Sequence, residues 1–157
     1  LNKNINFHLY GDKQFLKISK KIKNVKIFNF INYNKIPETL SKYEIALMPY
    51  QKRVKGRSSI WLEKYMSPLK MFDYLAARMI IIASNLEVYK HILKNNYNAV
   101  LVKVNDDKLW SQKIQKLFKH NGKKNRLINN AYKTAKKYTW EKRCKKIINF
   151  GNQRFNY

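Results

Sequence analysis

Short apolar runs of strand length alternate with segments of helical periodicity over much of this 157-residue chain. Such alternation predicts a parallel sheet with helices on both faces, because each parallel strand needs a crossover connection that a helix usually supplies. Five runs have the length and the β-branched or aromatic content of strands. They are Ile5–Tyr10, Val25–Phe30, Ile45–Met48, Ile80–Ala83 and Val100–Val102. We therefore predict a doubly wound, Rossmann-like α/β fold of about five strands.

The remaining segments have the periodicity of amphipathic helices. Phe15, Ile18 and Ile22 follow one another at spacings of three and four. Pro37 favours the first turn of a short helix. From Asp106 onward the pattern is helical only, and Thr139 is a good N-cap for the last helix. We predict one domain, residues 1–157, with a helical C-terminal tail.

The net charge of +25 is the strongest feature of the composition. A charge of this size favours anionic partners such as nucleic acid, anionic lipid or phosphorylated substrates. Most of the basic residues are lysines spread along the chain, whereas arginine is the residue that binds guanine and phosphate in a bidentate way. We favour a solvated lysine surface and keep a basic binding module for nucleic acid or anionic surfaces as the first alternative.

Signatures of membrane, metal and cofactor proteins are missing from the sequence. No apolar run reaches the ~18–20 residues of a membrane span. His8, His91, His120 and Cys144 lack the spacing of metal ligands, and the four glycines form no phosphate-binding loop. We expect no metal and no cofactor. The single cysteine suits a reducing cytoplasm, and the charge adds peripheral contact with an anionic inner membrane face as an expectation.

The most informative segment is Ser67–Ala77, with the sequence SPLKMFDYLAA. Ser67 is a good N-cap and Pro68 is the favoured first helical residue, so a helix should begin here. Lys70 and Asp73 lie three residues apart and share one helix face. Three apolar residues at spacings of three and four are expected on the buried face: Leu69, Phe72 and Ala76.

This helix start has the chemistry of a nucleotide site. Free backbone N–H groups at a helix N-terminus accept phosphate, and a carboxylate one turn later can accept hydrogen bonds from a ribose diol. The strand before it ends at Met48, and the carboxyl ends of parallel strands are where open α/β sheets bind ligands. The alternative interpretation is an ordinary surface pair of Lys70 and Asp73, which would contribute only a few tenths of a kcal/mol.

The order of these segments resembles the C-terminal, donor-binding domain of family-four (group one) glycosyltransferases, which have the two-Rossmann glycosyltransferase B fold. The resemblance covers nearly the whole chain in order. Its landmarks are Phe7–Asp12, Asn24–Phe30, Pro37–Leu40, Tyr43–Pro49 (YEIALMP), Ser67–Ala77, Ile80–Ser84, Asn98–Val102 and Tyr138–Arg143 (YTWEKR).

The resemblance implies a donor site. In this family a Glu-x7-Glu pattern brackets the donor loop, the second acid binds the nucleotide ribose, and the backbone between the acids meets the phosphates and the sugar. Asp73 occupies the second acidic position, which makes Ser67, Pro68, Leu69, Lys70 and Asp73 the implied donor-binding residues. The loop Ile31, Asn32 and Tyr33 resembles the family's base-contacting loop; a half-exposed loop aromatic is the alternative for Tyr33. No catalytic residue is implied.

Three positions depart from the family pattern. Tyr65 stands where the first Glu is usual, Arg78 where a Gly usually follows the helix, and His91 where a Glu is common. These departures keep a degenerate, non-catalytic homologue as the second alternative.

The implied activity is transfer of a hexose from a UDP-, GDP- or ADP-sugar to a glycan, lipid or small-molecule acceptor, with retention of configuration and without a metal. By the same resemblance, the first strand of the domain, the Arg and Lys that neutralise the diphosphate, and the acceptor domain are expected upstream of Leu1. We therefore expect a fragment that is inactive alone.

Overall fold

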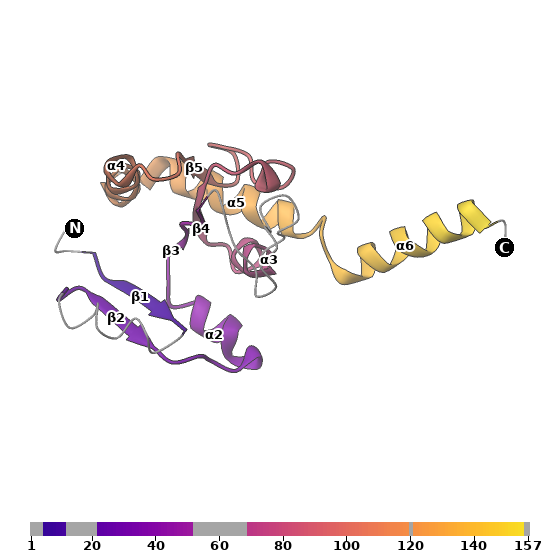
Figure 1. Cartoon of the computed structure of the whole chain (residues 1–157), viewed down its shortest axis with the longest axis horizontal. Coiled ribbons are helices and arrows are strands. Elements are labelled where there is room, and N and C mark those ends of the chain that lie inside the picture. The colour runs from indigo at the N-terminus through magenta and orange to yellow at the C-terminus, as the bar shows by residue number, and fades with distance from the viewer. Residues whose placement is uncertain (1–4, 12–21, 52–68, 120, 156–157) are drawn as a thin grey trace. The chain divides into compact units, whose positions relative to one another are not determined.

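The computed structural model describes residues 5–11, 22–51, 69–119 and 121–155. The predicted helix through Phe15 and Ile18, and the positions Tyr65, Ser67 and Pro68, lie outside these described residues. The chain divides into two compact units, Leu1–Lys42 and Tyr43–Tyr157 (Figure 1). Each unit is built around parallel strands.

The first unit contains strands β1 (Phe7–Tyr10) and β2 (Val25–Phe28). They pair in parallel with Phe7 opposite Val25 and Tyr10 opposite Phe28. At the start of the pair, the Asn24 side-chain amide donates to the carbonyl of Ile5 at 2.7 Å. The rings of Tyr10 and Phe28 stack with centroids 4.9 Å apart, a cross-strand aromatic contact that favours this register.

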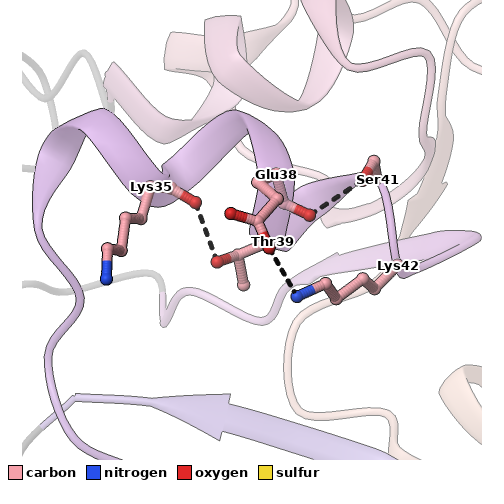
Figure 2. A network of polar contacts seen from close by, with 5 residues as sticks. All are labelled: Lys35, Glu38, Thr39, Ser41 and Lys42. Carbon is pink, nitrogen blue, oxygen red and sulfur yellow. Dashed lines mark hydrogen bonds and ion pairs between the residues drawn. The ribbon is translucent and has the colours of Figure 1, made fainter.

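After β2 the chain passes through the short 3₁₀ turn η2 (Tyr33–Lys35) into helix α2 (Ile36–Leu40). Pro37 lies in the first turn of α2, as predicted, where its missing N–H costs nothing. Local polar contacts fix this helix (Figure 2). The Thr39 hydroxyl donates to the Lys35 carbonyl, and the Ser41 hydroxyl donates to the Glu38 carbonyl, both at 2.8 Å.

The second unit contains strands β3 (Ile45–Met48), β4 (Ile80–Ser84) and β5 (Val100–Val102). They form a parallel sheet in the order β3-β4-β5. Every residue of the central strand β4 is buried, as its continuous apolar sequence predicts for a strand covered on both faces. The helices are α3 (Leu69–Ala76), α4 (Asp107–Lys119), α5 (Lys124–Ala135) and α6 (Trp140–Phe155), with 3₁₀ turns η3 (Glu87–Tyr89) and η4 (Asn121–Lys123).

The five predicted strands are all present and all pair in parallel, so the α/β class is confirmed. They form two sheets, of two and three strands, instead of the single sheet that we expected. Alternation in a sequence predicts strands and their direction, and does not specify which strands are neighbours.

The core of the second unit lies between the sheet and helices α3 and α5, which pack against each other and against β4 (Figure 1). Helix α3 contributes Met71 and Leu75, both buried. The predicted buried face of this helix was wrong: Leu69 is 66% exposed, Ala76 is exposed and Phe72 is half-buried. Because nearly every uncharged position of α3 is apolar, two sets of residues satisfy the helical spacing, and packing selects the other set.

The end of α3 explains one departure from the family pattern. Arg78 adopts a left-handed conformation with φ 57°. The Met79 N–H donates to the Tyr74 carbonyl at 3.1 Å, and the Arg78 N–H donates to the Leu75 carbonyl at 3.3 Å. This pair of bonds is the Schellman motif, whose left-handed residue is usually glycine. The Arg78 guanidinium lies 4.1 Å from the centroid of the Tyr132 ring on α5.

We expect Arg78→Gly to be more stable than Arg78→Ala by about 1 kcal/mol. Both variants lose the stacking on Tyr132, but only glycine adopts the left-handed conformation without a Cβ penalty. Denaturant unfolding of the two variants beside the parent chain measures this difference. Equal stabilities of the two variants would contradict the assigned backbone conformation.

The C-terminal part of the chain is helical, as the sequence predicts. The Asp106 carboxylate accepts a hydrogen bond from the Leu109 N–H at 2.9 Å at the start of α4. The Thr139 hydroxyl accepts from the Lys142 N–H at 3.3 Å at the start of α6, so Thr139 is the cap that we expected. On α6, Trp140, Ile147, Ile148 and Phe150 are all exposed.

Candidate functional site

The carboxyl edge of the three-stranded sheet is the place where the fold brings polar side chains together. Strand β3 ends at Met48 and is followed by Pro49 and Tyr50. Strand β4 ends at Ser84 and is followed by η3, which closes with Tyr89. Helix α3 begins at the same edge, as the contact between its Lys70 and Tyr50 indicates. The Lys70 ammonium lies 5.4 Å from the centroid of the Tyr50 ring. The predicted position of this helix relative to the sheet is therefore confirmed for its described part.

Lys70 lies in the first turn of α3 and is charged. Partial burial of the ammonium is the largest single effect and by itself would lower the pKa of Lys70, but the interactions with Tyr50 and Tyr74 together outweigh it, the hydrogen bond to the Tyr50 side chain first among them. Electrostatic interaction with the hydroxyl groups of Tyr50 and Tyr74 acts in the same direction. The pKa of Lys70 therefore lies above its ordinary value, and the side chain carries a full positive charge at neutral pH.

Asp73 follows one turn later on α3 and is half-buried. Burial raises the pKa of its carboxyl group above the ordinary value, because the charged form loses hydration. Among the described residues, four ion pairs form, and none of them joins Lys70 to Asp73. The four pairs are Glu38–Lys42, Glu87–Lys90, Glu44–Lys124 and Glu141–Lys145. The simple surface ion pair that we considered for Lys70 and Asp73 is absent.

Three tyrosines lie near Lys70 or contact its neighbour Tyr50, and sequence reasoning did not select them: Tyr50, Tyr74 and Tyr89. Tyr50 and Tyr89 contact each other edge to face, with ring centroids 6.2 Å apart. Tyr89 is fully buried, and its hydroxyl has no hydrogen-bond partner among the described residues. Burial strongly raises the pKa of Tyr89 and also raises that of Tyr74. The only sequence signal was the position of Tyr50, which follows Pro49 just beyond the predicted strand Ile45–Met48.

The structure brings together some of the predicted site residues. Leu69, Lys70 and Asp73 lie on α3 in the second unit, whereas Ser67 and Pro68 are outside the described residues. The predicted base loop, Ile31 to Tyr33, follows β2 in the first unit. Its Ile31 is half-buried and Asn32 is exposed.

Tyr33 in this loop is 78% exposed, more than the half-exposed loop aromatic that we considered as the alternative. Three positions depart from the family pattern, and Arg78 is described above. Of the other two, Tyr65 is outside the described residues, and His91 is exposed just after η3.

Two negative findings apply to the described part of the chain. No cluster of three His, Cys, Asp or Glu side chains is arranged to hold a metal ion within residues 5–11, 22–51, 69–119 and 121–155. Over the same residues, none of the helices combines the length and the apolar character that a membrane span requires.

Several solved structures share this fold at low sequence identity. A glycosyltransferase from Rickettsia africae has a TM-score of 0.72 and 14% identity over 96% of this chain and 40% of that protein. Sucrose-phosphate synthase from Thermosynechococcus elongatus has a TM-score of 0.75 and 15% identity over 95% of this chain and 38% of the synthase. Anabaena HepE, solved in complex with UDP, has a TM-score of 0.63 and 13% identity over 83% of this chain and 36% of HepE. This chain therefore spans well under half of these relatives.

No curated protein sequence matches the chain. Residues 1–134 match the family described as glycosyl transferases group 1, which agrees with the order of segments and with the parallel α/β fold. These residues include both parallel sheets and helix α3 with Lys70 and Asp73. The chain belongs to the group 1 glycosyltransferases, and its parallel α/β fold matches part of the solved glycosyltransferase B structures.

Proposed function

We propose that this chain is the donor-binding domain of a hexosyltransferase that uses a nucleoside-diphosphate sugar. The observation that carries the proposal is the arrangement on α3 at the carboxyl edge of a parallel sheet. A charged lysine stands in the first turn of the helix, and one turn later stands a half-buried carboxylate that has no ion-pair partner among the described residues. This spacing suits a ligand that has a diphosphate and a ribose diol side by side.

Each residue has a distinct role in this proposal. The Lys70 ammonium attracts the donor diphosphate and stabilises the negative charge that grows on it as the bond to the sugar breaks. The Asp73 carboxylate accepts hydrogen bonds from the ribose hydroxyls, and its partial burial strengthens those bonds. The resemblance assigns the base to the loop Ile31–Tyr33, in which the Tyr33 ring is exposed. Lysine and helix N–H groups supply the charge stabilisation, with no metal required.

The nucleotide is the first specificity to test. UDP, GDP and ADP all have the diphosphate and ribose that Lys70 and Asp73 would bind. Among proteins of the same fold, HepE was solved with UDP and with UDP-glucose, and the pneumococcal O-GlcNAc transferase GtfA was solved with UDP and GlcNAc. These complexes support uridine as the nucleotide to test before guanosine and adenosine. Retention of configuration and a glycan, lipid or small-molecule acceptor belong to the same proposal.

Asp73→Ala should weaken binding of UDP or GDP by more than about 1 kcal/mol, the scale of a hydrogen bond to a charged group. The stability of the fold should change little, because partial burial already disfavours the charged form of this carboxylate. Isothermal titration calorimetry measures the affinity. Asp107→Ala is the matched control, since Asp107 is an exposed carboxylate of the same unit on α4.

Unchanged nucleotide affinity in Asp73→Ala would remove Asp73 from the site. If the parent chain also bound DNA with an affinity that fell steeply with salt, and melted at the same temperature with and without nucleotide sugars, a basic binding module would replace the proposal.

A further inference from the structure

We propose that Tyr50 is the positioning residue for Lys70: its side chain holds the lysine ammonium beside the start of α3, in the place where the donor diphosphate binds. The ligand in this statement rests on the proposed function. The hold of Tyr50 on Lys70 rests on the fold alone, and the two parts can be tested separately.

The geometry joins three segments that are distant in the sequence. Tyr50 lies two residues after β3, Lys70 is the second residue of α3, and Tyr89 ends the turn η3 after β4. The Lys70 Nζ atom lies 5.4 Å from the centroid of the Tyr50 ring, within the range of a cation–π interaction. The other side of this contact is fixed, because the Tyr50 ring meets the Tyr89 ring at 6.2 Å and an interplanar angle of 68°.

Tyr50 is a rigid support. Its backbone N–H donates to the Met48 carbonyl at 2.9 Å, which forms a tight turn through Pro49. Its side chain is half-buried against the core cluster that contains Met48, Met71 and Tyr89. Tyr89 is fully buried, and its hydroxyl makes no hydrogen bond within the described residues. Tyr89 therefore holds Tyr50 by ring contact.

Lysine needs such a support to act at a defined place. Its side chain has four rotatable bonds and about 2 kcal/mol of rotamer entropy, so an unsupported ammonium samples many positions. The charged and titratable groups near Lys70 are Tyr50, Tyr74 and Asp73. Asp73 forms no ion pair with Lys70 among the four pairs of the described residues.

The chemistry of the supporting group also matters. A carboxylate partner would neutralise the ammonium and compete with an incoming diphosphate. A tyrosine hydroxyl and ring orient the ammonium and leave its net positive charge in place. Tyr50 is therefore suited to present Lys70 as a fixed charge for an anionic ligand.

The test is Tyr50→Phe in the 157-residue chain, which removes the hydroxyl and keeps the ring against Tyr89. Two quantities are measured: the pKa of Lys70 by NMR titration of isotopically labelled lysines, assigned with Lys70→Met, and the affinity for UDP by calorimetry. We expect the pKa of Lys70 to fall, because burial remains while the hydrogen bond is lost. We expect UDP to bind about three- to tenfold more weakly, the effect of one ordinary hydrogen bond.

Tyr97→Phe is the matched control, since Tyr97 is an exposed tyrosine of the same unit that is outside the cluster; neither quantity should change. An unchanged Lys70 pKa in Tyr50→Phe would overturn the inference. A weaker affinity in Lys70→Met together with an unchanged affinity in Tyr50→Phe would also overturn it, and would leave the proposed function standing. A lowered pKa with the same UDP affinity in all variants would retain the hold of Tyr50 on Lys70 and overturn the diphosphate as its ligand.

Discussion

Leu75→Ala should lower the free energy of unfolding by about 3 kcal/mol, whereas Leu69→Ala should change it by less than about 0.5 kcal/mol. Both leucines lie on α3. Leu75 is fully buried among Met71, Ile81 and Tyr89, so its truncation removes apolar contacts and leaves a cavity. Leu69 is 66% exposed and loses little when it is truncated.

Denaturant unfolding of the two variants beside the parent chain measures the difference. The same chemical change on the same helix controls for helix propensity and for the size of the truncation. Equal effects, or a larger effect of Leu69→Ala, would mean that α3 buries the face predicted from the sequence instead of the observed one. Such a result would also turn Lys70 and Asp73 away from their observed positions, because all four residues share this helix.

Strand positions were predictable from the sequence to within a few residues. Ile45–Met48 and Val100–Val102 match their predictions, and β4 extends one residue further, to Ser84. The first two strands are shorter than predicted, at Phe7–Tyr10 and Val25–Phe28. Continuous β-branched and aromatic runs between turn signals identify buried parallel strands well, because few other structures bury such a run on both faces.

Orientation around a helix and contacts between distant segments were not predictable in the same way. Which face of α3 is buried depends on the surfaces of the sheet and of α5 that pack against it. The sequence of α3 itself does not contain that information. The cluster of Tyr50, Tyr89 and Lys70 forms only after β3 and β4 are paired. Sequence reasoning could place a charged lysine and a carboxylate on one helix start, but not the contact of that lysine with Tyr50 or of Tyr50 with Tyr89.

At the Schellman motif after α3, the structure explains a departure from the family pattern that the sequence alone could only identify. The resemblance marked Arg78 as a departure from a usual glycine, which suggested a degenerate protein. In the structure, Arg78 adopts the left-handed conformation that glycine would adopt, and its guanidinium stacks on Tyr132. The loss of glycine is therefore accommodated by the backbone and by α5. Arg78 by itself gives no reason to expect a damaged donor site.

The isolated 157-residue chain should release no nucleotide from UDP- or GDP-sugars above the rate of uncatalysed hydrolysis. The chain spans 40% of the Rickettsia africae glycosyltransferase and 38% of the sucrose-phosphate synthase that it resembles. We propose that it binds the donor and that a separate domain must hold the acceptor. Holding two reactants in place can supply on the order of 7–11 kcal/mol of the barrier, so a donor half without an acceptor half should lose nearly all catalysis.

The exposed face of α6 offers a way to test where that second domain acts. Ile147 and Phe150 are exposed, which leaves apolar side chains on α6 for contact with another domain. The measurement is nucleotide release from a panel of UDP- and GDP-sugars by the isolated chain and by a longer polypeptide in which an acceptor-binding domain precedes residue 1. Transfer should appear only in the longer polypeptide, and Ile147→Asp should reduce it there by disrupting domain contact, while UDP affinity of the isolated chain stays the same. Turnover by the isolated chain at the rate of the longer one would show that residues 1–157 also bind the acceptor.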